Sequence, residues 1–135
     1  MLKLGVFVGE NNWTFFKEIY DDLTVHYQTQ VFKPKFYTVP VLHNRLNRLA
    51  FSRGVQEILT NSDVCFFEWA SDLFAVVSYM PKSSKIVTRL HSFELYDWAP
   101  KVNWDAVDKI ILVSHAMQKM FAELYPEHAS KTVVI

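Results

Sequence analysis

Short apolar runs alternate with longer segments of helical spacing along the whole chain, and this order leaves few folds open. The short runs are rich in Val, Ile and Phe, as strands buried on both faces of a sheet are. The longer segments repeat apolar residues at intervals of three and four, as amphipathic helices do. Strands that alternate with helices are typical of βαβ units, whose strands run parallel. The sequence therefore predicts an α/β fold: a three-layer Rossmann-like domain with a mainly parallel sheet and helices on both faces.

The bounds of the segments follow from the apolar pattern and from the turn residues between them. Predicted strands cover residues 2–8, 64–67, 85–90, 109–113 and 132–135, and two further β-rich pieces cover 27–32 and 36–39. Predicted helices cover residues 12–25, 42–59, 72–80 and 114–125, with one helical turn at 104–107. Ser114 is the predicted N-cap of the last helix, which stops before Pro126.

Length and composition indicate one globular domain covering residues 1–135. Domains usually contain roughly 100 to 200 residues, and half of the residues of this chain are hydrophobic while only three are Gly. The single cysteine, Cys65, excludes an internal disulfide and multi-cysteine metal sites, and it favours a reducing compartment. No apolar run reaches the roughly 20 residues that span a bilayer, and Met1 is not followed by a signal peptide. We therefore expect a cytoplasmic protein.

Charge is balanced in total but unevenly distributed. Fourteen basic residues face fourteen acidic ones, which argues against a general nucleic-acid binder. No acid occurs between Asp22 and Glu57, and this interval predicts a positive face formed by Lys33, Lys35, Arg45, Arg48 and Arg53. Such a face is either an ordinary solvated surface, a contact with another domain, or a peripheral contact with anionic lipid at the inner face of a membrane.

Polar residues follow four of the predicted strands at the point where each strand ends. Because the carboxyl ends of parallel strands lie along one edge of a sheet, these residues predict a site for a polar small molecule there. The candidates are Gly9, Glu10, Asn11, Asn12, Glu68, His91, Glu94 and Ser114.

Several of these candidates have an alternative reading in which they only build the fold. Residues 9–12 also suit a turn and a helix cap, and they lack the G-x-G-x-x-G and P-loop patterns of nucleotide sites. Ser114 suits a helix cap better than a nucleophile, because no G-x-S-x-G elbow surrounds it.

His91 is the sharpest candidate, because it directly follows a strand and precedes Glu94 by three residues. Arg89, inside the same strand, needs a carboxylate partner, and we expect an ion pair with Glu68 or Glu94. These two glutamates also admit a glycosidase-like carboxylate pair. His91, Glu94 and His115 do not have the spacing of a zinc motif, so no metal site is predicted.

Five segments follow one another in an order that resembles a known family. Between residues 63 and 135 they read D-V-C-F-F-E, K-I-V-T-R-L-H-S-F-E, N-W-D-A-V-D-K-I-I-L-V-S, M-Q-K-M-F-A-E-L-Y-P and K-T-V-V-I. In this order they resemble the N-terminal domain of GT-B fold glycosyltransferases, and most closely the large retaining family 4. Residues 1–62 share with that family only the opening strand and Gly9.

The resemblance implies the acceptor-binding half of an enzyme that moves a sugar from a UDP- or GDP-type donor to a glycan, lipid or other acceptor. On that reading His91 matches the family's histidine at the cleft, and the other edge residues named above line the acceptor side. No cofactor and no metal are required. The implied partner is a C-terminal Rossmann-like domain that binds the donor.

The chain departs from the family in two respects. Glu10 follows Gly9 where the family commonly has a Gly-Gly pair, and the donor-binding half is not contained in these 135 residues. We therefore expect the 135 residues alone to transfer no sugar.

A hypothesis of a different class is a non-catalytic, flavodoxin-like binding or regulatory module. A receiver domain would need an acidic cluster after the first strand and an Asp closing the middle strand, where this chain has Glu10 and Glu68.

Overall fold

The computed structural model describes residues 1–8, 13–33, 43–68, 72–91 and 94–135. Its strands are β1 (Lys3–Val8), β2 (Gln28–Val31), β3 (Val64–Glu68), β4 (Lys85–Leu90), β5 (Lys109–Leu112) and β6 (Thr132–Val134). Its helices are α1 (Trp13–His26), α2 (His43–Asn61), α3 (Asp72–Val77), α4 (Glu94–Asp97) and α5 (His115–Leu124). Short 3₁₀ turns cover Ala99–Lys101, Trp104–Ala106 and Pro126–Lys131.

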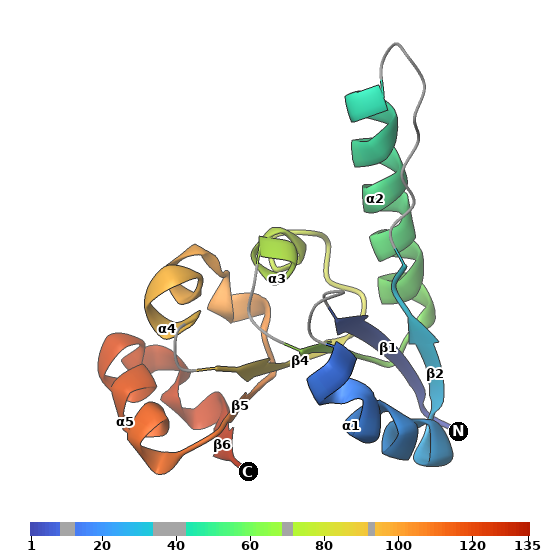
Figure 1. Cartoon of the computed structure of the whole chain (residues 1–135). Coiled ribbons are helices and arrows are strands. Elements are labelled where there is room, and N and C mark those ends of the chain that lie inside the picture. The colour runs from blue at the N-terminus through green and yellow to red at the C-terminus, as the bar shows by residue number, and fades with distance from the viewer. Residues whose placement is uncertain (9–12, 34–42, 69–71, 92–93) are drawn as a thin grey trace.

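The strands form one sheet of order β2-β1-β3-β4-β5-β6, and every pair of neighbours is parallel (Figure 1). The chain runs outward from β1 to β2 and then returns to the other side of β1 with β3. Strand order therefore reverses between β1 and β3. The prediction of an α/β, Rossmann-like fold with a parallel sheet is confirmed.

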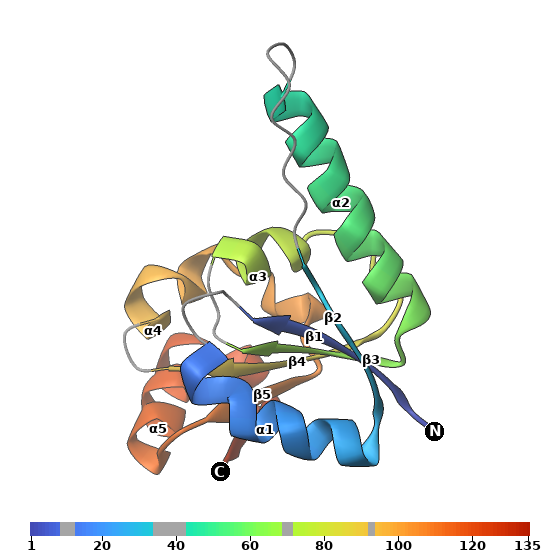
Figure 2. The same cartoon turned by 45° about the vertical axis from the view of Figure 1, so that its right-hand side comes forward.

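Helices cover both faces of the sheet (Figures 1 and 2). On one face, residues of α2, α3 and α5 pack with the strands in a core that contains Phe67, Phe74 and Phe121. On the other face, Phe16 of α1 packs against β1 in a smaller core that includes Val6. The three layers follow from the sequence because the central strands are apolar on both sides.

Aromatic rings pack on β3 on both faces of the sheet. Phe7 stacks on Phe67 with ring centroids 4.4 Å apart, and Phe16 of α1 stacks on Phe66 at 5.6 Å. Successive residues of a strand point to opposite faces, so the consecutive Phe66 and Phe67 serve the two cores separately. β3 is therefore anchored in both cores, at the point where strand order reverses.

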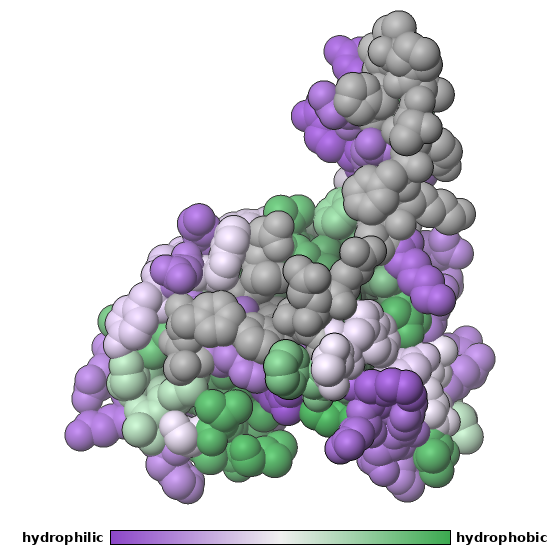
Figure 3. Space-filling model, in the orientation of Figure 1, coloured by the Kyte–Doolittle hydropathy of each residue, from purple (hydrophilic) through white to green (hydrophobic). Residues whose placement is uncertain are grey.

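The smaller core ends toward β5 and β6. Ile111 is half-buried on the face that α1 covers elsewhere, and its register partner Val133 is 38% exposed. Ile135 after β6 is exposed too, and Figure 3 shows hydrophobic side chains gathered near the end of the chain.

Most predicted segments coincide with observed elements, with shifted ends. The predicted helix 72–80 ends at Val77, because residues 78–80 form turns in which Ser78 Oγ donates to the carbonyl of Ala75. The predicted helix 42–59 continues to Asn61. The short helix α4 was not predicted, and the β-rich piece 36–39 lies outside the described residues.

Within the described ranges, no helix combines the length and the apolar character that crossing a bilayer requires.

Gly5 of β1 lies against α2 so closely that a methyl group does not fit. A Cβ at this position would stand 2.6 Å from Ile58 Cγ2 and 2.8 Å from Ser62 Oγ. We expect Gly5→Ala to lower the free energy of unfolding by about 2 kcal/mol through overpacking, as measured by urea denaturation.

The matched control is Gly54→Ala in α2, where the nearest atom to the new Cβ is Phe32 Cε2 at 3.2 Å. Ala also favours a helix interior by roughly 0.5–1 kcal/mol over Gly. Equal destabilisation by the two substitutions would contradict the close approach of β1 and α2.

Candidate functional site

Glu68 is the last residue of β3 and lies at the point where strand order reverses. In open parallel sheets, ligands bind outside the carboxyl ends of the strands at this point. Val8 of β1 is its register partner on one side and Arg89 of β4 on the other. The Glu68 side chain is fully buried. A carboxylate in this position needs compensation by hydrogen bonds and opposite charge.

Arg89 supplies that compensation from the neighbouring strand. Its Nε and Nη2 atoms donate to Glu68 Oε1 at 2.9 and 2.6 Å. Residues in register on parallel strands point to the same face, so the two side chains meet directly across neighbouring strands. The predicted ion pair is confirmed, and its carboxylate is that of Glu68.

His91 joins the same carboxylate oxygen from the end of β4. Its Nε2 atom lies 3.0 Å from Glu68 Oε1. An ionised carboxylate only accepts hydrogen bonds, so this contact places a proton on Nε2. The His91 side chain is 20% exposed, and the ring therefore connects the buried carboxylate with the surface.

Glu94 holds the backbone of His91 in place. Its Oε1 accepts from the His91 N–H at 2.9 Å, and its own N–H donates to the His91 carbonyl at 3.1 Å. Glu94 is itself buried and begins α4. The short helix and the end of β4 are thereby tied together, and this fixes where the imidazole stands.

The second carboxylate oxygen of Glu68 differs from the first. Glu68 Oε2 is buried and has no hydrogen-bond partner within the part of the chain that the structure describes. All the contacts to Glu68 given above end on Oε1.

The structure thus brings Glu68, His91 and Glu94 together, as the edge prediction requires, and adds Arg89. Sequence reasoning treated Arg89 only as a structural partner. The signal for its place in the site was a charged residue near the carboxyl end of the strand, followed two positions later by His91.

The remaining candidates are Ser114 and residues 9–12. Ser114 caps α5, since its Oγ accepts from the Met117 N–H at 3.2 Å, and the predicted N-cap is confirmed. Gly9, Glu10, Asn11 and Asn12 lie outside the described residues.

Neither metal ligation nor thiol chemistry finds support among the residues with described positions. They contain no group of three or more His, Cys, Asp or Glu side chains that could hold a metal ion. Cys65 is buried, and burial raises the pKa of its thiol despite hydrogen bonds with Ser84 and Ser62. The thiolate that nucleophilic chemistry needs is therefore disfavoured.

The basic residues lie in a separate region. Arg45, Arg48 and Arg53 are exposed along α2, which extends well beyond the sheet (Figures 1 and 2). Lys33 follows β2 and is exposed, whereas Lys35 lies outside the described residues.

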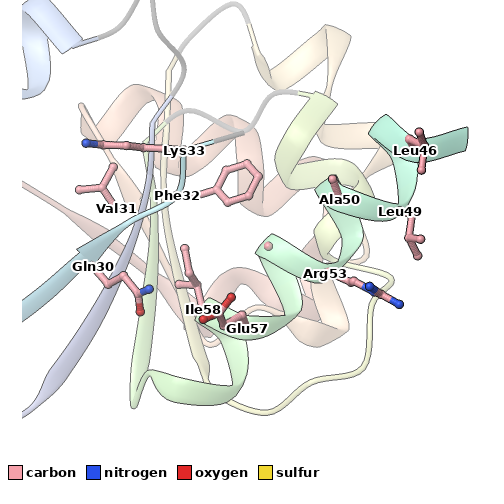
Figure 4. A pocket seen from close by; sticks show the side chains of 11 residues that line it. Gln30, Val31, Phe32, Lys33, Leu46, Leu49, Ala50, Arg53, Glu57 and Ile58 are labelled. Carbon is pink, nitrogen blue, oxygen red and sulfur yellow. The ribbon is translucent and has the colours of Figure 1, made fainter. Parts of the chain in front are cut away.

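A cavity of about 430 Å³ opens between α2 and β2. Phe32 points into it toward α2, and Leu46, Leu49 and Arg53 line its helical side (Figure 4). Among the carboxyl-edge candidates that the structure describes, none lines this cavity. We place the candidate site at the edge, because charged groups converge there in buried contacts.

Comparison with protein-family models, with curated proteins and with solved structures finds no match to this chain.

Removal of Arg89 should destabilise the fold through the carboxylate that it leaves behind. We expect Arg89→Met to lower the free energy of unfolding by roughly 3 kcal/mol, because Glu68 would remain buried without its main compensating charge. Urea denaturation at neutral pH measures this loss.

The double variant Glu68→Leu/Arg89→Met removes both charges and keeps apolar volume in the same place. It should regain most of the lost stability. If the double variant were no more stable than Arg89→Met, the pair would not be the source of the effect.

Proposed function

We propose that this chain is the acceptor-side domain of a retaining, nucleotide-sugar-dependent glycosyltransferase of the GT-B type. The observation that carries the proposal is the position of His91. It follows β4 at the carboxyl edge, and its ring contacts a buried carboxylate from the adjacent strand. The ordered motifs of residues 63–135 resemble family 4 enzymes, in which a histidine of the matching motif stands at the cleft.

In this proposal, His91 contacts the transferring sugar or the acceptor near the reaction centre. Glu68 and Arg89 act as positioning residues, because Glu68 Oε1 contacts the ring at Nε2 and Arg89 donates to the same oxygen. The domain contributes orientation of the acceptor and stabilisation of charge that develops as the leaving phosphate departs. Glu94 contributes by fixing the backbone that carries the imidazole.

The proposal includes a donor-binding partner. A second Rossmann-like domain of the same protein would bind a UDP- or GDP-type sugar across the cleft from His91. The acceptor is a sugar or a lipid-linked glycan, and the enzyme works in the cytoplasm, at the inner face of the membrane when the acceptor is a lipid.

One observation favours a second candidate. The order β2-β1-β3-β4-β5 within the sheet is that of flavodoxin-like proteins, many of which bind a ligand at the β1/β3 reversal without transferring a group. A small-ligand-binding or regulatory module would use the same edge. The two candidates differ in whether the native protein contains a donor half and turns over nucleotide sugars.

The shape of α2 favours a peripheral membrane contact in addition. Leu46 and Leu49 are 38% and 48% exposed, and they lie beside Arg45 and Arg48 in the first half of α2. The two leucines also line the cavity toward β2. Exposed apolar residues flanked by cations suit the surface of an anionic bilayer. The alternative occupant of this surface is the second domain.

Turnover separates the glycosyltransferase from the binding module. We expect the native product, purified from its source, to be larger than 15.8 kDa and to release UDP or GDP from a panel of nucleotide sugars when acceptor is present. The 135-residue chain alone should release none. In the native product, His91→Ala should reduce the rate by about 100-fold, as loss of a preorganised polar group at a reaction centre does.

A control substitution is His115→Ala, which removes an exposed imidazole at the start of α5. It should leave the rate unchanged. A native product of 15.8 kDa without turnover would instead support the binding module. Equal effects of His91→Ala and His115→Ala on the rate would contradict a role of His91 in the reaction.

Charge reversal on α2 tests the membrane contact. Arg45→Glu/Arg48→Glu should weaken co-sedimentation with anionic liposomes by at least about tenfold, since each basic residue contributes about 1 kcal/mol at such a surface. Lys119→Glu, at an exposed position on α5, is the matched control. Equal binding to neutral vesicles, or binding that is insensitive to salt, would contradict the electrostatic contact.

A further inference from the structure

The two oxygens of the buried Glu68 carboxylate differ in their hydrogen bonds. Arg89 Nε, Arg89 Nη2 and His91 Nε2 all lie within 3.0 Å of Oε1. Oε2 is equally buried, and no group in the described part of the chain donates to it. An ionised carboxylate has about four acceptor positions, so the described residues leave the acceptor positions of Oε2 unused.

A buried acceptor without a donor is costly. Leaving a buried polar atom unsatisfied costs roughly 1–3 kcal/mol, and more when the group is charged. The fold could have spread the two Arg89 nitrogens over both oxygens in the common bidentate fork, which would have satisfied each of them. Instead both nitrogens donate to Oε1, and Oε2 keeps its capacity to accept hydrogen bonds.

The geometry points to a substrate hydroxyl on Glu68 Oε2. We propose that this atom accepts a hydrogen bond from a neutral hydroxyl group of a polyhydroxylated acceptor, and that it determines specificity at the carboxyl edge. This inference rests on the proposed function, and it names the chemistry of the acceptor group that lies beside His91.

Local charge selects a neutral donor. An anionic group such as a phosphate would face the negative oxygen directly at short range, where like charges repel strongly. A cationic group would compete with Arg89, whose guanidinium already lies 2.6 Å from the other oxygen. A hydroxyl satisfies Oε2 without adding charge, and its own oxygen keeps its lone pairs.

The position of the hydroxyl follows from the cluster. Oε1 of the same carboxylate binds the imidazole of His91, so a hydroxyl on Oε2 stands next to the residue that the proposed function places at the reaction centre. Glu68 therefore aligns substrate and histidine through a single rigid group. Such shared anchoring limits the relative motion of the two partners.

The test is a titration of the ¹⁵N-labelled 135-residue chain, followed by the amide signals of His91 and Glu94. The probes are the methyl glycosides of glucose, mannose and galactose, and then the four monodeoxy forms of the one that binds most tightly. We expect one deoxy form to bind about tenfold more weakly than its parent, as loss of a hydrogen bond to a charged group predicts.

Glu68→Gln should bind this deoxy form and the parent glycoside equally, because the charged acceptor is gone. Glu68→Asp keeps the charge that Arg89 needs but withdraws the oxygens by one carbon, and it should behave in the same way. Far-UV circular dichroism checks that each variant is folded. Glu123→Gln, exposed on α5, is the control and should retain the discrimination of the natural chain.

Three outcomes would overturn the inference. One is the absence of binding by every glycoside, and another is tighter binding of inorganic phosphate at the same amides. The third is a ratio of affinities for parent and deoxy glycosides that is the same in the natural chain and in both Glu68 variants, as expected if Oε2 holds only water.

The turnover assay tests the proposed function independently. Release of UDP or GDP, together with an affinity ratio that does not depend on Glu68, would contradict only the role of Glu68. Glycoside binding that depends on Glu68 without turnover by the native product instead leaves a sugar-binding module.

Discussion

A carboxylate that closes the central strand of a parallel sheet has to be compensated there, and the carboxyl edge of this protein is built around that requirement. Glu68 lies between β1 and β4 with its side chain fully buried. Arg89 reaches it because the register of β3 and β4 puts the two residues side by side. His91 and α4 are then placed by contacts to Glu68 and Glu94. The edge is therefore a connected polar network on an apolar sheet.

The two cores hold this network in position. Phe66 and Phe67 immediately precede Glu68, and each ring stacks in a different core. A shift of β3 by one residue would exchange these faces and turn the carboxylate away from Arg89. Packing in the interior thus sets the geometry at the edge. Such a rigid support suits a site whose chemistry depends on orientation more than on a strongly reactive group.

The network and the α2 region suggest a division of roles across the molecule. Buried charges converge at the carboxyl ends of β3 and β4. The exposed cations and the 430 Å³ cavity lie at α2 and at β2, which is the edge strand beyond β1. A polar group of a substrate suits the first region, and an anionic surface suits the second.

Local sequence signals determined the order of strands and helices, the burial of the central strands on both faces, the cap at Ser114 and the need of Arg89 for a carboxylate. Each of these depends on residues close together in the chain, through periodicity, capping or the cost of burying a charge. Only the tertiary structure decided the strand order, the choice of Glu68 over Glu94 as the partner of Arg89, and the division of donors between Oε1 and Oε2. Glu68 and Arg89 are 21 residues apart, and their meeting depends on which strands pair and in which register. The packing of side chains between distant segments settles that choice, and no pattern within either segment contains it.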